Sequence, residues 1–155
     1  MNDLSPQPPS ASSSEMTQMV LPNDTNTLGN LLGGRLMHWI DIIASIAGRR
    51  HCGFPVVTAS MDKLDFLQPV KLGEVVILKA CINRVFNTSM EIGVTVYAEN
   101  PYKREFLHTA SSYLTFVALD DDGKPVKIPP VEPQTDEEKR RYAAAGIRRE
   151  KRIKR

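Results

Sequence analysis

The sequence lacks the marks of a membrane-spanning, secreted or disulfide-bonded protein. No apolar run approaches the roughly 18 residues that a spanning helix needs. The N-terminus has no basic segment followed by an apolar one, which a signal peptide requires. The two cysteines, Cys52 and Cys81, form no CxxC pair. These absences predict a soluble cytoplasmic protein with reduced thiols.

Several catalytic signatures are also missing. The sequence contains neither a P-loop nor G-x-G-x-x-G, which argues against nucleoside triphosphate or dinucleotide chemistry. It also lacks the G-x-S-x-G motif of the α/β-type serine hydrolases, which argues against that class of enzyme. The histidines His38, His51 and His108 have no metal-ligand spacing, so we expect neither a metal nor a cofactor. His51 and Cys52 are chain neighbours, which rarely form a base and nucleophile, so Cys52 is expected to be structural.

The overall composition is ordinary, but the charged residues are distributed unevenly along the chain. The 155 residues suit one domain, and they are 41% apolar and 25% charged with a net charge of +2. Between Lys139 and Arg155, however, nine Lys or Arg stand against one acid, Glu150. This tail could bind nucleic acid, but it has no aromatic residue beyond Tyr142 and no recognised module beside it. A solvated tail is therefore the expectation.

The two ends differ from the middle. Residues 1–17 are rich in Ser and Pro and have little to bury, which predicts a disordered leader. Residues 18–132 are the predicted domain. In residues 133–155, Thr135 with Glu138 three positions later matches a capping box, which predicts a short C-terminal helix that fades into the basic tail.

The middle of the chain changes from a helical to a strand period. Apolar residues predict a single helix from about Gly34 to Arg50, ended by Gly53 and Pro55. Alternating and β-branched stretches then predict four strands, at 56–61, 74–86, 89–99 and 105–119. Strands this long must curl. The predicted fold is therefore α+β, with a curled antiparallel sheet wrapped around one central helix.

Asp41 is the most informative residue of that helix. The stretch 36–47 is so apolar that it predicts burial nearly all round, and an unpaired carboxylate there would be costly. Buried charges survive because something pairs with them or because the chemistry uses them. His38 and Ser45 share the face of Asp41. A structural aspartate, satisfied by Ser45 and a backbone donor, would explain the same pattern.

The start of the helix offers a second group of candidates. Gly33 and Gly34 would leave free backbone N–H groups at the positive end of the helix dipole, which suits the oxyanion of an acyl-transfer reaction. Asn26 supplies an amide side chain just upstream. Alternatively, the glycine pair serves a tight turn or close packing, and Asn26 is a turn residue or an N-cap.

Several motifs in order resemble the hotdog-fold acyl-CoA thioesterases, in particular the brain-type acyl-CoA hydrolases and their bacterial single-domain relatives. The resemblance runs from about Pro22 to Tyr142. Its clearest motifs are Asn26-x-x-Gly29-x-x-x-Gly33-Gly34, Trp39-Ile40-Asp41, Val56 to Asp62, Phe66-Leu67-x-Pro69-Val70 and Thr88-Ser89-Met90-Glu91. One departure is Ile42, where the common helix motif has a glutamate, so a role for a second carboxylate is in doubt.

The resemblance implies a hotdog fold and a homodimer with active sites at its interface, often assembled as a trimer of dimers. It also implies that Asp41 and Asn26 are the functional aspartate and asparagine. The expected reaction is hydrolysis of fatty acyl-CoA, with Asp41 as general base or as nucleophile and with Gly33 and Gly34 at the oxyanion. The expected CoA-binding residues are Arg84, Asn87, Thr88 and Ser89.

Two other functions stay open. A hotdog protein could bind acyl-CoA without cleaving it, although the presence of both Asn26 and Asp41 argues against that. A hotdog enoyl-CoA hydratase would need an Asp and His pair in a hydration motif, and His38 is only a faint hint of one.

Overall fold

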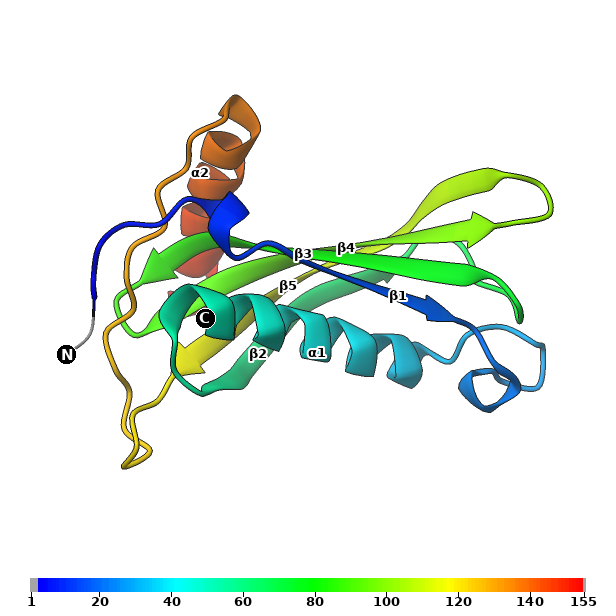
Figure 1. The fold of residues 1–155 in the computed structure, drawn as a ribbon, viewed down its shortest axis with the longest axis horizontal. Helices are drawn as coiled ribbons and strands as arrows, with labels where there is room; N and C mark the ends of the chain where they lie inside the picture. Colours follow the sequence, from blue (N-terminus) through cyan, green and yellow to red (C-terminus); the bar gives the residue numbers. More distant parts are fainter. Residues whose placement is uncertain (1–2, 155) are drawn as a thin grey trace.

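A computed structural model describes residues 3–154, and Figure 1 shows its arrangement. A five-stranded antiparallel sheet carries the helix α1 on one face and the helix α2 on the other. No helix in residues 3–154 is long and apolar enough to cross a membrane. In chain order the elements are η1 (Pro9–Ala11), β1 (Ser14–Met19), η2 (Pro22–Asp24), α1 (Gly33–Cys52), β2 (Val56–Phe66), β3 (Val75–Phe86), β4 (Ser89–Asn100), β5 (Glu105–Ala118) and α2 (Asp136–Ile153).

The strand order is β1-β3-β4-β5-β2, so β1 and β2 form the two edges. The hairpin of β3 and β4 turns at Asn87, whose φ of 67° is the left-handed conformation that asparagine tolerates. Register shifts at Thr58/Ser60 and Asp62/Asp65 interrupt the pairing of this edge strand with β5, which resumes at Asp65 and Phe66. The predicted strand at 56–61 is thus longer than expected, because it continues past the irregularity to Phe66.

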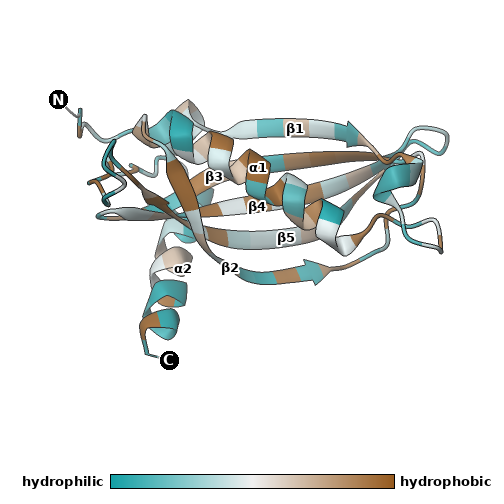
Figure 2. Cartoon of the chain, turned by 90° about the horizontal axis from the view of Figure 1, so that it is seen from below, coloured by the Kyte–Doolittle hydropathy of each residue, from teal (hydrophilic) through white to brown (hydrophobic). Residues whose placement is uncertain are grey.

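Helix α1 is the central helix that the sequence predicts. It lies across the sheet (Figure 2), and its apolar face is buried against the sheet. Leu36, Ile40 and Ile43 are buried there at 1% exposure or less. Gly48 allows a close approach, since a Cβ at this position would lie 2.8 Å from the Met90 side chain. The helix ends at Gly53, whose φ of 74° closes it in the left-handed conformation. This packing confirms the α+β fold.

The predicted disordered leader, residues 1–17, is wrong for residues 7–17. The strand β1 pairs with β3 from Ser14 to Met19, and the Gln7 N–H donates to the Pro130 carbonyl at 3.0 Å. An edge strand gains order from backbone hydrogen bonds, which a composition poor in apolar residues does not reveal. Residues 1 and 2 of the predicted leader lie outside the described part.

The predicted short helix is wrong in its length, because α2 continues to Ile153, and the prediction of a solvated tail is wrong for Arg148 and Arg152 alone, while Lys139, Arg140, Lys151 and Lys154 are exposed. The capping box of α2 is present as predicted, with Glu138 N–H donating to Thr135 Oγ1 at 3.1 Å. Further along, Arg148 donates two hydrogen bonds to Glu91, and Arg152 forms an ion pair with Asp62 at 2.5 Å. These basic residues are thus partners of acids on the sheet.

Candidate active site

The N-terminal end of α1 presents unused backbone donors. Its N-cap, Leu32, provides no side-chain hydrogen bond, and within residues 3–154 no acceptor meets the N–H groups of Gly33 and Gly34. The segment leading to the helix is held in place, since Leu31 N–H donates to the Val70 carbonyl at 2.7 Å and Leu32 N–H to the Asp24 carbonyl at 2.8 Å. The free N–H groups therefore sit on a positioned helix start, with the positive end of the dipole behind them.

Asp41 lies about two turns further along α1 and is half-buried in the single chain. The prediction that this helix is buried nearly all round is wrong, because the sheet covers only one of its faces and Met37 and His38 are exposed. A carboxylate at the margin of the core keeps access to solvent, so its charge does not need the full compensation of a buried one.

The partner of Asp41 is Thr58 on β2, whose Oγ1 donates to Asp41 Oδ1 at 2.5 Å. Ser45, the partner considered from the sequence, instead donates to the Ile42 carbonyl of its own helix at 2.8 Å. No signal in the sequence marks Thr58 as the partner of Asp41, because threonine is ordinary in a strand. Only the packing of β2 beside α1 brings it to Asp41.

Asn26 lies in the exposed loop between η2 and α1. Its Oδ1 accepts hydrogen bonds from the N–H groups of Leu28 at 2.9 Å and Asn30 at 3.1 Å, as an Asx turn requires. This leaves the Nδ2 group without a partner in the described residues, so it can donate to a ligand. Within one chain Asn26 makes no hydrogen bond to Asp41, so the described chain alone does not join the two predicted catalytic side chains.

The predicted CoA-binding residues lie elsewhere, at the β3–β4 hairpin near the C-terminal end of α1. The Arg84 guanidinium stacks over the Tyr142 ring at 4.1 Å and donates to the Tyr142 carbonyl at 3.3 Å, so in this chain it holds α2. Asn87 and Thr88 form the turn, and their carbonyls accept from Ile128 and Ala118. Ser89 Oγ reaches the Phe86 carbonyl at 3.5 Å.

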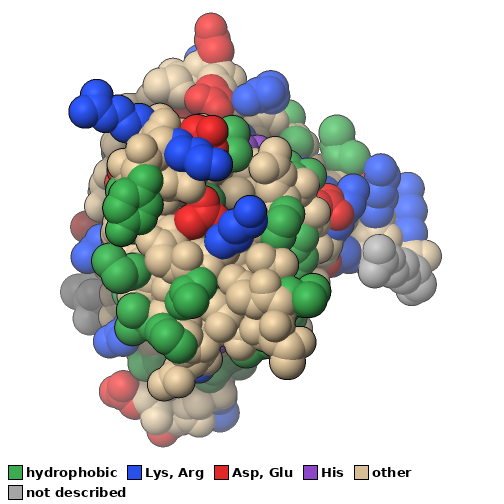
Figure 3. Space-filling view, turned by 90° about the vertical axis from the view of Figure 1, so that its right-hand side faces the viewer, with side chains coloured by type: hydrophobic (Ala, Val, Ile, Leu, Met, Phe, Trp, Pro, Cys, Tyr) green, Lys and Arg blue, Asp and Glu red, His purple; other side chains and the backbone are tan. Residues whose placement is uncertain are grey.

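Exposed apolar side chains gather around the N-terminal end of α1, the end of the molecule that Figure 3 faces. Gly33 lies against one of them, since a Cβ there would be 3.5 Å from the Phe66 ring. Apolar patches of this kind mark contact surfaces. The exposed members are Leu28 at 81%, Leu32 at 39%, Phe66 at 50%, Leu67 at 57% and Leu72 at 50%.

The histidine and cysteine at the C-terminal end of α1 have surroundings that suit a structural role. His51 is buried and its Nε2 lies 2.7 Å from the Pro129 carbonyl, while burial lowers its pKa. Burial also raises the pKa of the Cys52 thiol, which suits a structural role. Both cysteines are free. In residues 3–154, no three His, Cys, Asp or Glu side chains gather as they would around a metal ion.

The fold and these motifs have close counterparts among known proteins. The thioesterase superfamily profile matches residues 28–104. An uncharacterized acyl-CoA thioester hydrolase of Bacillus subtilis is 48% identical over 122 residues, which cover 79% of this chain and 71% of that protein. The chain belongs to the hotdog acyl-CoA thioester hydrolases of this superfamily.

Solved structures agree with this family in their fold. The crystal structure of an apo-hexameric acyl-CoA thioesterase has a TM-score of 0.94 at 41% identity, covering 97% of this chain and 96% of that one. The acyl-CoA hydrolase of Staphylococcus aureus, solved with butyryl coenzyme A, coenzyme A and coenzyme A disulfide, has a TM-score of 0.89 at 41% identity, covering 95% and 90%. Structures of three variants of that enzyme, in which an aspartate, an asparagine or a threonine is replaced by alanine, have also been solved.

A mammalian relative matches over a similar length of this chain. The cytosolic acyl coenzyme A thioester hydrolase of Rattus norvegicus is 36% identical over 145 residues, which cover 90% of this chain and 38% of that protein.

Proposed function

We propose that this acyl-CoA thioester hydrolase uses Asp41 as the general base. The observation that carries the proposal is the hydrogen bond from Thr58 to Asp41, which lies about 10 Å along α1 from the uncapped start of that helix. With Oδ1 held by Thr58, Oδ2 is free to accept a proton from a water molecule. Because of this separation, the N–H groups of Gly33 and Gly34 would come from a partner chain, where they would stabilise the oxyanion that forms when this water attacks the thioester carbonyl.

The second half of the reaction returns the proton. When the tetrahedral intermediate collapses, the carbon–sulfur bond breaks, and the CoA sulfur takes the proton from Asp41. The products are a free acid and CoA. Direct attack by Asp41, through an anhydride that water then opens, would use the same residues.

The variants of the Staphylococcus aureus enzyme support this set of residues. The three positions replaced by alanine there are spaced along that chain as Asn26, Asp41 and Thr58 are spaced here. Asn26 with its free Nδ2 would orient the water or the thioester carbonyl.

We further propose that a partner chain completes each site. Within the described residues no hydrogen bond joins Asn26 to Asp41, and the exposed apolar side chains at the start of α1, together with the β2 edge, offer a surface for a second copy. The hexameric relatives are consistent with a trimer of dimers. The proposed substrate is an acyl-CoA. The CoA-binding role of Arg84, Asn87, Thr88 and Ser89 stays a prediction. The name of the rat relative supports a cytoplasmic location for this protein.

A thiol-release assay across acyl-CoA chain lengths tests the reaction on the purified protein. Steady release of CoA is expected, and tight acyl-CoA binding without release would favour a non-catalytic binding protein. Mixing Asn26→Ala chains with Asp41→Asn chains tests the shared site. If each site combines the two residues from different chains, mixed oligomers regain activity that neither variant has alone. No regain after confirmed chain exchange would contradict the shared site.

A further inference from the structure

His38 lies on the exposed side of α1, close to the proposed base. It stands four positions after Gly34 and three before Asp41, so the three residues share one side of the helix. Side chains three positions apart on a helix have their Cβ atoms about 5–6 Å from one another. The His38 side chain therefore begins one turn from Asp41, in the direction of the start of α1.

The ring nitrogens of His38 are free to bind a ligand. The two other histidines are held inside the chain, since His51 and His108 each place Nε2 2.7 Å from an oxygen atom of another residue. Within residues 3–154, His38 has neither such a hydrogen bond nor an ion pair with Asp41. A neutral imidazole carries one donor and one acceptor, so His38 can offer both.

The polarity of this side of α1 changes at Asp41. Toward the start of the helix, the next polar side chain is that of His38. In the other direction the half-buried Ile42 and Ile46 follow, and the hydroxyl of Ser45 is turned back to the helix backbone. A thioester of CoA joins a polar pantetheine arm to an apolar acyl chain, so its two halves need different surroundings. Asp41 lies where such surroundings meet.

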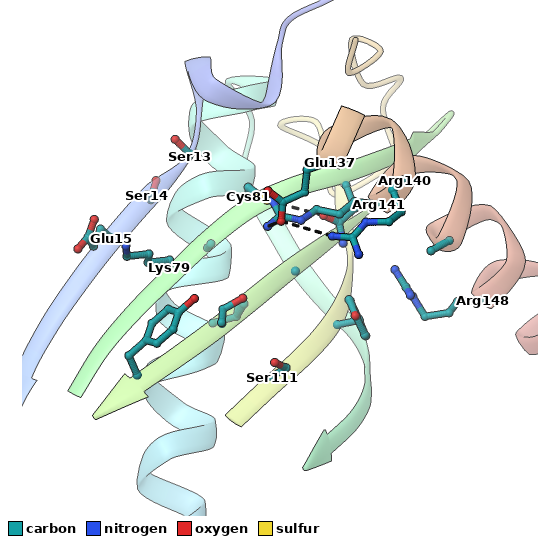
Figure 4. Close-up of a pocket in the computed structure, with 18 residues that line it drawn as sticks. Ser13, Ser14, Glu15, Lys79, Cys81, Ser111, Glu137, Arg140, Arg141 and Arg148 are labelled. Carbon is teal, nitrogen blue, oxygen red and sulfur yellow. Dashed lines mark hydrogen bonds and ion pairs between the residues drawn. The ribbon is translucent and has the colours of Figure 1, made fainter. Parts of the chain in front are cut away.

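This side of α1 is remote from the cavity beneath α2. That cavity, of about 620 Å³, lies on the opposite face of the sheet from α1 (Figure 4). His38 is not among the residues that line it. A substitution of His38 therefore changes the surroundings of Asp41 and leaves the α2 side intact.

We propose that His38 is a substrate-binding residue that hydrogen-bonds the first amide of the pantetheine arm. The inference rests on the proposed role of Asp41. The amide nitrogen lies two methylene groups beyond the thioester sulfur, a separation similar to the spacing of the two side chains along the helix. The amide offers an N–H and a carbonyl oxygen, which complement the acceptor and the donor of a neutral imidazole. The contact would hold the arm while the carbonyl is attacked.

Thiol-release kinetics with one acyl group on three different thiols test the proposal. CoA and N-acetylcysteamine carry the amide, whereas propanethiol lacks it. His38→Ala should lower kcat/KM about two- to tenfold for the first two thioesters, mainly through KM, because one neutral hydrogen bond is lost. The propyl thioester should be hydrolysed as by the original chain. His38→Gln, whose side chain again offers a donor and an acceptor, should recover most of the loss.

Arg49→Ala is the matched control, because Arg49 is also exposed on α1 but lies about two turns beyond Asp41. It should keep the original preference among the three thioesters. A larger rise of KM in Arg49→Ala than in His38→Ala would place the arm along the other half of the helix and overturn the proposal. An equal loss on all three thioesters in His38→Ala, or no loss on any, would also overturn it.

Binding to the Asp41→Asn protein gives a result that does not depend on the base. Adding His38→Ala should weaken calorimetric binding of the N-acetylcysteamine thioester about two- to tenfold and leave the propyl thioester unchanged. Equal affinities with and without His38→Ala would contradict the role of His38 even if Asp41 is the base. If Asp41→Asn still hydrolyses the thioesters, the role of Asp41 fails, and the comparison of the three thioesters still decides the role of His38.

Discussion

The two faces of the sheet are covered by helices of opposite character. Helix α1 packs through fully buried aliphatic side chains such as Leu36, Ile40 and Ile43, each worth about 1.5–3 kcal/mol when removed from water. Helix α2 has one fully buried residue, Ala145, and is held by arginines that pair with acids or stack on rings. One face is thus held by apolar area and the other by charge.

Because of this difference, the two buried or half-buried carboxylates, Asp41 and Glu91, serve different purposes, one in the reaction and the other in stability. On the α1 face the apolar contacts hold the helix, so the carboxylate of Asp41 is not needed for packing and stays available for the reaction. On the α2 face the carboxylate of Glu91 is fully buried, and its oxygens are occupied by Arg148 and by Asn83 Nδ2 at 2.8 Å. We therefore expect substitutions in the Glu91–Arg148 pair to lower the stability of the fold, and substitutions in the Asp41–Thr58 pair to lower the rate of the reaction.

Arg148→Ala should give the largest loss of stability. It would leave the buried carboxylate of Glu91 without its cation, which typically costs about 3–5 kcal/mol. Denaturant unfolding followed by circular dichroism measures the change. Arg149→Ala is the control, because Arg149 stacks on the Phe86 ring without a buried acid. Equal stability of Arg148→Ala and the original chain would show that charge does not hold this face.

Thr58→Val should lower kcat while the fold is kept, because valine preserves the shape of the side chain and removes the donor to Asp41. A hydrogen bond to a charged group is worth roughly 1.5–3 kcal/mol, so the expected loss is about tenfold to a hundredfold. Thr58→Ser, which restores the hydroxyl, should recover most of the rate. If Thr58→Val is as fast as the original chain, Thr58 does not position the base.

Arg84→Ala distinguishes two roles for one residue on the α2 face. If Arg84 binds the nucleotide end of CoA, its loss should raise KM about tenfold for acyl-CoA and leave acyl-pantetheine, which lacks that end, nearly unchanged. If it only holds α2 through Tyr142, the melting temperature falls and the two substrates are affected alike. Kinetics with both substrates, together with a melting curve, separate these outcomes.

The smallest expected effect concerns pH and the end of α1. Burial lowers the pKa of His51, so the unfolded chain takes up the proton first as the pH falls below about 6.5. The stability that the neutral imidazole supports is complete above that pH and is lost as the pH falls toward the folded pKa. Unfolding free energies between pH 5 and 7 should show this decline, and His51→Gln should remove it. An unchanged slope in His51→Gln would assign the decline to other groups.

The α1 face could be predicted well from the sequence, and the α2 face could not. An apolar period marks a packed helix, and the motifs around Asn26, Gly33 and Asp41 indicate the family. By contrast, Glu91 and Arg148 are 57 positions apart, and each resembles an ordinary surface residue until the sheet and α2 come together. The strand β1 and the role of Thr58 as the partner of Asp41 could not be predicted for the same reason. Backbone pairing and contacts between distant elements produce no periodic pattern in the sequence.

The most direct test of the central claim is to measure thiol release and unfolding on the same folded Asp41→Asn protein. Asparagine keeps the size and the oxygen that accepts from Thr58, but it cannot take a proton. The account predicts near-original stability with a loss of turnover on the order of a hundredfold or more, the usual contribution of acid–base catalysis. A stable Asp41→Asn protein that hydrolyses acyl-CoA at close to the original rate would contradict it.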